Sequence, residues 1–197
     1  MEAHGREFIG CKNCDLVFQN PAQLPTLEFE RQRYLEHENH IGNIGYTDFL
    51  GRLINALRPF LKHRQLGLDF GCGPSPVLAT LLAREGYVVD CYDPFFFPYP
   101  TRPKYDFVTA SEVCEHFHNP GREFGLICSL LGEDAHLGIM TAMLSNEVDF
   151  EQWYYARDET HVCFYSPSTF EVIAELFQLQ ILSLTHNVVV LKTRRSH

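Results

Sequence analysis

A glycine turn between a buried strand and a helix constrains the fold of this chain more than any other feature. The apolar stretch Leu66–Phe70 is typical of a short buried strand, and Val77–Arg84 has the apolar spacing of a helix. Pro76 stands at the expected start of that helix, where its fixed φ angle is tolerated. Gly71 and Gly73 allow a tight turn and close approach of the backbone to a ligand, because glycine has no Cβ. The sequence therefore predicts a strand–turn–helix unit with a ligand site at the turn.

The residues around the turn indicate which ligand it holds. A second strand over residues 87–92 ends at Asp93, where a carboxylate is placed to accept hydrogen bonds from ribose hydroxyls at the edge of a parallel sheet. A dinucleotide site has a third glycine where this chain has Pro76, which disfavours NAD and FAD. The charge of Asp69 repels a pyrophosphate. It suits the cationic end of a nucleoside cofactor such as S-adenosylmethionine.

These residues resemble the first motif of the class I S-adenosylmethionine-dependent methyltransferases, in which an acid precedes spaced glycines. Asp69, Gly71 and Gly73 match that motif, and Ser75 replaces its last glycine. The resemblance implies S-adenosylmethionine as cofactor and methyl transfer as activity. The cofactor-binding residues that we expect are Asp69, Gly71, Cys72, Gly73, Asp93 and, after a later strand, Glu112.

Composition and charge disfavour several other classes of protein. The 197 residues carry a net charge of −9 and are 45% hydrophobic, which suits a globular domain and disfavours sequence-independent nucleic-acid binding. We find no apolar run that approaches a membrane span, and the first residues lack a signal peptide's apolar core. Seven scattered cysteines are typical of reduced thiols. We therefore expect a cytoplasmic monomer or homodimer whose partner is a small-molecule acceptor.

The remaining pattern predicts strands and helices in alternation. We expect an irregular segment over residues 1–30, helices over 28–40, 46–61, 120–131 and 166–177, strands over 105–111 and 135–144, and a hairpin of strands 179–185 and 188–193. Four prolines in residues 94–103 leave no room for a full helix and third strand. The expected fold is an α/β Rossmann-like methyltransferase sandwich, with a mostly parallel sheet, a C-terminal antiparallel hairpin and a shortened third-strand region. Residues 1–30 are expected to form an N-terminal appendage, and residues 31–197 the methyltransferase domain.

A second group of polar residues follows the third predicted strand. Glu112, Glu115 and His116 stand at the carboxyl edge beside the expected cofactor. His161 begins a later aromatic segment that leads into a capped helix. The spacing E-V-x-E-H and the segment from His161 resemble those of the ubiquinone-biosynthesis-like methyltransferases.

Three interpretations of Glu112, Glu115, His116 and His161 stay open. In the first, His116 or His161 is a catalytic base that takes the acceptor's proton, because histidine titrates near neutral pH. In the second, the two carboxylates and two imidazoles bind Mg²⁺ or another divalent ion, as the resemblance implies for some related enzymes. In the third, Glu112 lines the cofactor pocket while Glu115 and His116 cap the next helix.

Cys11 and Cys14 have zinc-knuckle spacing, and the residues that follow resemble the second half of a zinc ribbon fused to such methyltransferases. A structural zinc site needs four ligands, and the first cysteine pair of that ribbon does not occur in this sequence. His4, His37 and His40 are candidate substitutes, although their spacing matches no zinc pattern. Bound zinc and a plain pair of thiols are the two alternatives.

Aromatic residues flank the expected active edge. Tyr34, His37 and Tyr46 precede the first strand, in a segment that the resemblance places over the methionine end of the cofactor. The runs 95–97 and 153–155 are typical of core or lid packing, and an aromatic acceptor pocket is the alternative. The sequence thus predicts a methyltransferase. A catalytically silent protein with the same fold and an NAD-dependent oxidoreductase are the competing hypotheses.

Overall fold

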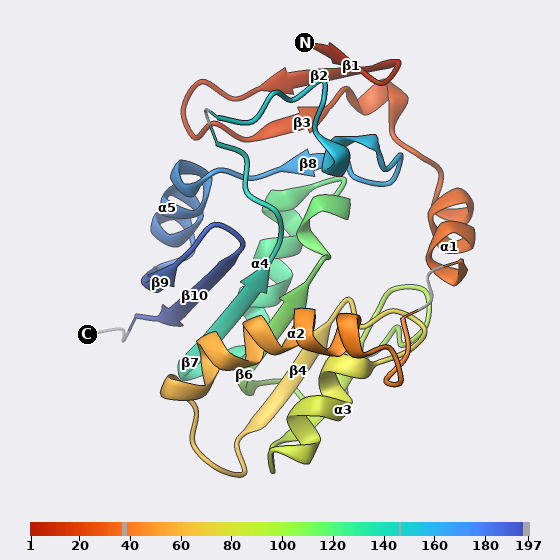
Figure 1. The fold of residues 1–197 in the computed structure, drawn as a ribbon. Coiled ribbons are helices and arrows are strands. Elements are labelled where there is room, and N and C mark those ends of the chain that lie inside the picture. The colour runs from red at the N-terminus through yellow and green to blue at the C-terminus, as the bar shows by residue number, and fades with distance from the viewer. Residues whose placement is uncertain (37–38, 146, 195–197) are drawn as a thin grey trace.

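The computed structural model of the chain describes residues 1–36, 39–145 and 147–194, and its largest element is a six-stranded sheet (Figure 1). The strands, in spatial order, are β5 (Val88–Tyr92), β4 (Leu66–Phe70), β6 (Tyr105–Ser111), β7 (Leu131–Met140), β10 (Val188–Thr193) and β9 (Leu179–Leu184). Within this sheet β10 alone runs antiparallel to both of its neighbours. The predicted Rossmann-like sheet with its C-terminal antiparallel hairpin is therefore confirmed.

Helices cover both faces of this sheet (Figure 1). The helices are α1 (Leu27–Leu35), α2 (Ile44–Leu57), α3 (Val77–Arg84), α4 (Pro120–Leu130) and α5 (Pro167–Leu176). One buried cluster joins α2 and α3 to Phe107 of β6, and a second joins α4 and α5 to Val108 of the same strand. Successive side chains of a strand point to opposite faces, so these neighbours divide the core into two layers.

The proline-rich link after β5 replaces the third strand. Residues 94–104 form neither helix nor strand, apart from an isolated bridge between Asp93 and Phe97. The carboxylate of Asp90 on β5 holds the end of this link, because it accepts hydrogen bonds from the Thr101 hydroxyl, from Arg102 Nε at 3.1 Å and from the Tyr105 hydroxyl at 3.1 Å. The prediction of a shortened third-strand region is confirmed, and β5 becomes the edge of the sheet.

The prediction that residues 1–30 are irregular is wrong. They form a second, four-stranded antiparallel sheet whose order is β1 (Glu2–Ala3), β2 (Arg6–Gly10), β3 (Val17–Gln19) and β8 (Cys163–Phe164). The strands are too short to show a clear alternation, and their last partner lies far along the chain. Phe8, Val17, Tyr155 and Phe164 are buried together in a third core cluster beneath this sheet.

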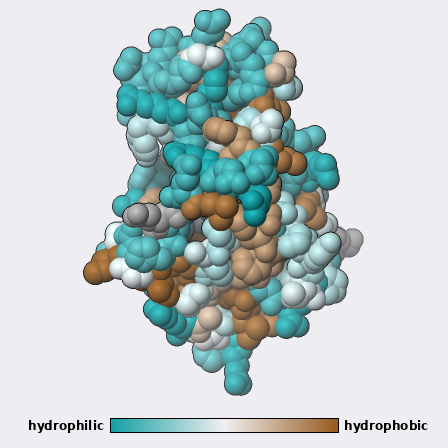
Figure 2. Space-filling model, turned by 90° about the vertical axis from the view of Figure 1, so that its right-hand side faces the viewer, coloured by the Kyte–Doolittle hydropathy of each residue, from teal (hydrophilic) through white to brown (hydrophobic). Residues whose placement is uncertain are grey.

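Helix α1 is attached to the rest of the molecule by polar and aromatic contacts. Glu30, which is buried, pairs with His118 at 3.1 Å, and Arg33 pairs with Asp158 at 3.4 Å. The helix leaves three large apolar side chains exposed, namely Leu27, Phe29 and Leu35. The side of the molecule that carries α1 shows hydrophobic patches among hydrophilic residues (Figure 2). The ring of Tyr34 on the same helix lies 5.8 Å from that of Phe95 and 5.1 Å from that of His116, so aromatic contacts also attach it.

Local capping residues begin the helices that flank the site. Pro76 precedes α3, and Asn119 caps α4 by accepting a hydrogen bond from the backbone N–H of Arg122. Ser166 and Thr169 form a reciprocal capping box at the start of α5, as the sequence predicts for Ser166. Among the described residues, each helix is either too short or too polar to cross a bilayer.

We expect Phe8→Ala to loosen the small sheet. Phe8 is buried, and its ring lies 5.0 Å from that of Phe150 and 5.8 Å from that of Phe164. Removing a buried aromatic ring costs about 3–5 kcal/mol of the free energy of unfolding. Fluorescence of Trp153, the single tryptophan, reports urea unfolding of this layer, because its ring lies 5.6 Å from Phe164. Ile9→Ala, at an exposed position of β2, is the matched control. Equal midpoints for the two variants would contradict this account of the third cluster.

Candidate active site

The glycine turn after β4 is fastened to the end of β5. The backbone N–H groups of Gly71 and Cys72 both donate to the carbonyl oxygen of Tyr92, at 2.7 and 3.2 Å. The N–H of Gly73 donates to Asp93 Oδ2 at 3.0 Å. The turn predicted to approach a ligand is thus held at the carboxyl edge of the parallel strands.

Both glycines have backbone angles that other residues rarely adopt, with φ of +74° at Gly71 and +64° at Gly73. A Cβ on Gly71 would lie 2.5 Å from the side chain of Val113, which leaves no room for it. A Cβ on Gly73 would meet no atom within 4 Å among the described residues, so the space beside this glycine is open. That open cradle fits a bound cofactor.

Asp93 is ordered by backbone donors before any ligand binds. Its Oδ1 accepts hydrogen bonds from the N–H groups of Phe95 at 2.9 Å and Phe96 at 3.2 Å, while Oδ2 accepts that of Gly73. Burial raises the pKa of this carboxyl, and the three backbone bonds oppose the shift. A carboxylate oxygen has lone pairs for more than one donor, so Oδ2 retains capacity to accept a ribose hydroxyl.

Asp69 lies deeper than the turn. Its carboxylate accepts the Thr109 hydroxyl at 3.2 Å and the backbone N–H of Ala79 at 3.2 Å, and so ties β4 to β6 and α3. Burial raises the pKa of Asp69 to about 7. Burial, and then the charges of Asp69 and Glu112, raise the pKa of the Tyr46 phenol to about 12.

A buried hydroxyl beside Asp69 also fits a ligand. Ser111 Oγ is shielded from solvent and has no hydrogen-bond partner among the described residues. Residues two apart on a strand share a face, so Ser111 points to the same side of β6 as Thr109 and the Asp69 carboxylate. An unpaired buried hydroxyl is costly in a folded protein and marks a place where a polar ligand atom completes the bonding. Gly73 and Ser111 thus both fit S-adenosylmethionine.

A second polar cluster surrounds Glu115, whose side chain is wholly buried. The Thr141 hydroxyl donates to Glu115 Oε2 at 3.1 Å, and the Tyr155 hydroxyl donates to Oε1. The same Tyr155 oxygen lies 3.2 Å from Glu112 Oε2. The one phenolic hydrogen of Tyr155 cannot be donated to both carboxyl groups at once.

The protonation of Glu112 resolves this conflict. Burial, followed by the nearby charge of Glu115, raises the pKa of Glu112 to about 9, so its carboxyl group keeps its proton at neutral pH. The proton of Glu112 is then donated to the Tyr155 oxygen while Tyr155 donates to Glu115. Glu112 also has a left-handed backbone, with φ of +52°, and its N–H donates to the carbonyl oxygen of Met140 at 2.8 Å.

His116 and His161 face each other, with ring centroids 4.8 Å apart. The Nδ1 atom of His116 lies 2.8 Å from the carbonyl oxygen of Thr160, and that of His161 lies 2.7 Å from the carbonyl oxygen of Tyr155. A carbonyl oxygen only accepts, so each Nδ1 carries a proton, and in the neutral ring Nε2 is the atom with the lone pair. Burial lowers the pKa of His116, which keeps this imidazole neutral at pH 7.

The structure brings some of the expected residues together and separates others. One ligand atom each from Glu115, His116 and His161 lies within 4.8 Å of the others, whereas Glu112 reaches this group only through Tyr155. Glu115 and His116 do not cap the next helix, because that position is taken by Asn119. The helix-capping part of the third interpretation is therefore wrong.

The Cys11–Cys14 pair lies in the turn between β2 and β3. Hydrogen bonds from the backbone N–H groups of Asn13 and Cys14, and from the Cys14 thiol, lower the pKa of the Cys11 thiol. Among residues 1–36, 39–145 and 147–194, no third histidine, cysteine or acid joins the pair within reach of one ion. His37 lies outside the described residues. Zinc at this turn stays a prediction without a complete ligand set.

Sequence analysis missed several contributors to this site. The hydroxyls of Thr141 and Tyr155 and the carbonyl oxygen of Thr160 hold Glu115 and His116, yet none of them belongs to a recognised motif. The only available indication was the aromatic run that contains Tyr155. Tyr34, expected near the cofactor, has its ring 5.1 Å from that of His116.

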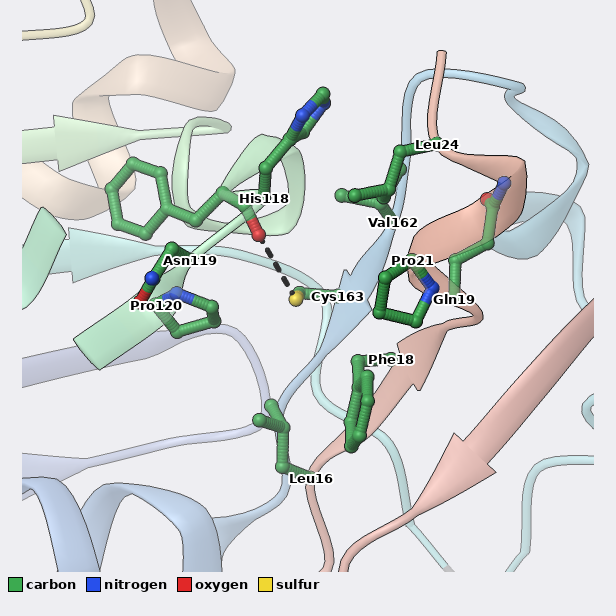
Figure 3. Close-up of a pocket in the computed structure, with 11 residues that line it drawn as sticks. Leu16, Phe18, Gln19, Pro21, Leu24, His118, Asn119, Pro120, Val162 and Cys163 are labelled. Carbon is green, nitrogen blue, oxygen red and sulfur yellow. Dashed lines mark hydrogen bonds between the residues drawn. The ribbon is translucent and has the colours of Figure 1, made fainter. Parts of the chain in front are cut away.

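An apolar pocket of about 220 Å³ lies between the small sheet and the start of α4 (Figure 3). The residues that line it are Leu16, Phe18, Gln19, Pro21, Leu24, Phe117, His118, Asn119, Pro120, Val162 and Cys163. Phe117 directly follows His116, and Val162 directly follows His161, but neither histidine lines the pocket itself. The Cys163 thiol donates to the carbonyl oxygen of Phe117 at 3.1 Å and joins the two segments (Figure 3).

Comparisons with known proteins agree with this architecture. Residues 39–184 match a family model described as a methyltransferase domain, and the chain belongs to that family. A comparison with curated protein sequences finds no match. Among solved structures, 1,6-didemethyltoxoflavin-N1-methyltransferase from Burkholderia thailandensis, with its substrate and S-adenosylhomocysteine bound, is 13% identical. The match covers 96% of this chain and 99% of that one, with a TM-score of 0.62.

A second similar structure is magnesium protoporphyrin IX methyltransferase from Synechocystis PCC 6803, with bound S-adenosylhomocysteine. It is 15% identical over 86% of this chain and 95% of that one, with a TM-score of 0.54. These likenesses show the fold. The chain therefore contains a methyltransferase domain with the Rossmann-like fold of these methyltransferases.

We expect Glu112→Gln to remove part of the pH dependence of stability. The folded state raises the pKa of Glu112 from 4.5 to about 9. The stability that this proton contributes is complete below pH 4.5 and is lost as the pH rises toward 9. Between about pH 6 and 8 the wild-type protein should lose about 1–3 kcal/mol more of its free energy of unfolding than the variant does.

Urea unfolding of the cofactor-free protein at both pH values measures this difference. Glu133→Gln, at an exposed position of β7, should keep the wild-type dependence. If the free energy of unfolding of Glu112→Gln falls with pH as steeply as that of the wild type, Glu112 is ionised in the folded state.

Proposed function

We propose that this protein is an S-adenosylmethionine-dependent methyltransferase that acts on a small-molecule acceptor. The observation that carries the proposal is the glycine turn, pinned to Tyr92 and Asp93, with open space at Gly73 and an unpaired buried hydroxyl at Ser111. The cofactor, when bound, supplies a methyl group already activated by its sulfonium. The paired histidines beside the same edge favour an enzyme over a catalytically silent protein of the same fold.

The cofactor residues then have distinct tasks. Gly71, Cys72 and Gly73 offer backbone to the cofactor, and Asp93 accepts the ribose hydroxyls. Asp69 and Glu112 line the side that faces Tyr46, where their raised pKa values limit the negative charge at neutral pH. The spacing of Glu112 with the residues after it also supports placing the protein in the ubiquinone-biosynthesis-like group.

The histidine pair is proposed to take the acceptor's proton. Each Nδ1–H is held by a carbonyl oxygen, so Nε2 is the ring nitrogen that takes the proton when the imidazole is neutral. A divalent ion at Glu115, His116 and His161 is the alternative role of the same atoms.

The nature of the acceptor follows from charge and shape. A net charge of −9 disfavours a polyanionic acceptor such as nucleic acid. The mainly apolar pocket lined by Phe117 and Val162, the residues that follow His116 and His161, suits an uncharged group of modest size. The substrates in the names of the two similar structures, 1,6-didemethyltoxoflavin and magnesium protoporphyrin IX, are also small molecules.

Calorimetry with S-adenosylhomocysteine tests the proposed function. We expect micromolar binding, roughly −8 kcal/mol. Asp93→Asn should weaken it by about 1.5–3 kcal/mol, because the amide keeps one acceptor oxygen but loses the charge-assisted bonds. Asp90→Asn, on β5 just before Asp93 but bonded to the 101–105 segment, should bind normally. Binding of NAD without binding of S-adenosylhomocysteine would refute the proposal.

Replacing either histidine should separate chemistry from cofactor binding. We expect His116→Gln and His161→Gln to keep their affinity for S-adenosylhomocysteine and to lose about 10²–10⁴-fold in turnover. Transfer of a labelled methyl group into a metabolite extract identifies the acceptor and then provides the assay. Activity abolished by a chelator and restored by Mg²⁺ or Mn²⁺ would replace the base with the metal. Full activity in both variants would remove the histidines from the mechanism.

A further inference from the structure

Arg6 belongs to the small sheet, but its guanidinium reaches the segment that carries His161. Nη1 donates to the carbonyl oxygens of His161 at 3.0 Å and Glu159 at 3.3 Å, and to the side-chain oxygen of Gln19 at 3.0 Å. Nη2 donates to the carbonyl oxygen of Ala156. One side chain thus binds three backbone carbonyl oxygens of the loop over residues 156–161.

The loop over residues 156–161 lies between two contacts of the proposed active site. The hydroxyl of Tyr155, just before the loop, binds Glu115, and the imidazole of His161, at its end, faces His116. Inside the loop, His161 Nδ1–H donates to the Tyr155 carbonyl oxygen, and the His161 N–H donates to that of Asp158 at 3.1 Å. The guanidinium therefore binds the same turn that positions the imidazole.

A guanidinium is the group suited to this place. Three carbonyl oxygens that converge on one point repel one another unless a cation with several fixed donors lies between them. The planar fork of arginine meets that need, whereas the single ammonium of lysine cannot hold the same directions. The ring of Phe8 lies 5.1 Å from the guanidinium carbon and supports it from within the third core cluster.

The small sheet reinforces the same connection through its backbone. The N–H of Gln19 donates to the carbonyl oxygen of Val162 at 2.8 Å, and the N–H of Val162 donates to that of Glu115 at 2.8 Å. The residue after His161 is thus bonded to β3 on one side and to the histidine–carboxylate cluster on the other.

We propose that Arg6 is a positioning residue of the active site, which holds His161 opposite His116 by fixing the carbonyls of the 156–161 loop. The small sheet then contributes to the active site, because it carries the residue that positions His161. The catalytic meaning of this position rests on the proposed function, but the position itself is measurable without an acceptor.

NMR of the histidine Cε1–H groups in the full-length protein tests this assignment. His161→Gln and His116→Gln identify the two resonances. In Arg6→Met we expect the His161 resonance to move or broaden and its titration midpoint to change, while binding of S-adenosylhomocysteine stays unchanged. Ethylguanidinium at millimolar concentration should restore the His161 resonance in Arg6→Ala. Arg58→Met, which removes an exposed arginine paired with Glu85, should leave both resonances alone.

The outcomes separate this proposal from the proposed function. A folded Arg6→Met protein with wild-type His161 resonance and titration would overturn the positioning role. Should Arg6→Met fail to fold, Arg6→Lys decides, because it keeps the charge and loses the fork. A perturbed His161 in folded Arg6→Lys supports the proposal, and an unperturbed one refutes it. Failure of the wild-type protein to bind S-adenosylhomocysteine would instead refute the proposed function and leave the positioning result intact.

Discussion

The wholly buried carboxylate of Glu115 is the constraint on which the arrangement of this site depends. A carboxylate removed from water must be matched by hydrogen-bond donors, and Glu115 finds them in the hydroxyls of Thr141 and Tyr155. Both donors come from the segment after β7, so this segment must return across the carboxyl edge of the sheet. His161 lies on the returning segment and is brought to His116. One buried charge thus links the two halves of the proposed catalytic pair.

The segment that returns across the carboxyl edge after β7 also couples the two sheets. Beyond His161, the chain enters β8 and completes the four-stranded sheet of the N-terminal residues. Tyr155 belongs to both environments, because its ring is buried in the cluster beneath that sheet while its hydroxyl lies among the acids. Packing of the small sheet and polar geometry in the active site therefore depend on one another. Perturbation of either should be felt in the other.

The sequence could predict those features that depend on residues close together in the chain. The glycine turn with β4 and α3, the final hairpin and the capping residue Ser166 all follow from short patterns of glycine, apolar spacing and hydroxyl caps. The small sheet did not, because its strands have two to five residues and β8 lies far along the chain. The contacts of Tyr155 were also hidden, since a hydroxyl aimed at a distant carboxylate leaves no spacing to recognise. The sequence grouped Glu112, Glu115, His116 and His161, and the rings of the two histidines do lie 4.8 Å apart, whereas Glu112 contacts this group through Tyr155.

A crystal structure with S-adenosylhomocysteine tests the central claim most directly. The account predicts that the ribose hydroxyls bind Asp93, that the chain of the cofactor passes Gly73 and Ser111, and that the sulfur faces the Nε2 atoms of His116 and His161. A cofactor bound elsewhere, or with its sulfur turned away from the two imidazoles, would contradict it.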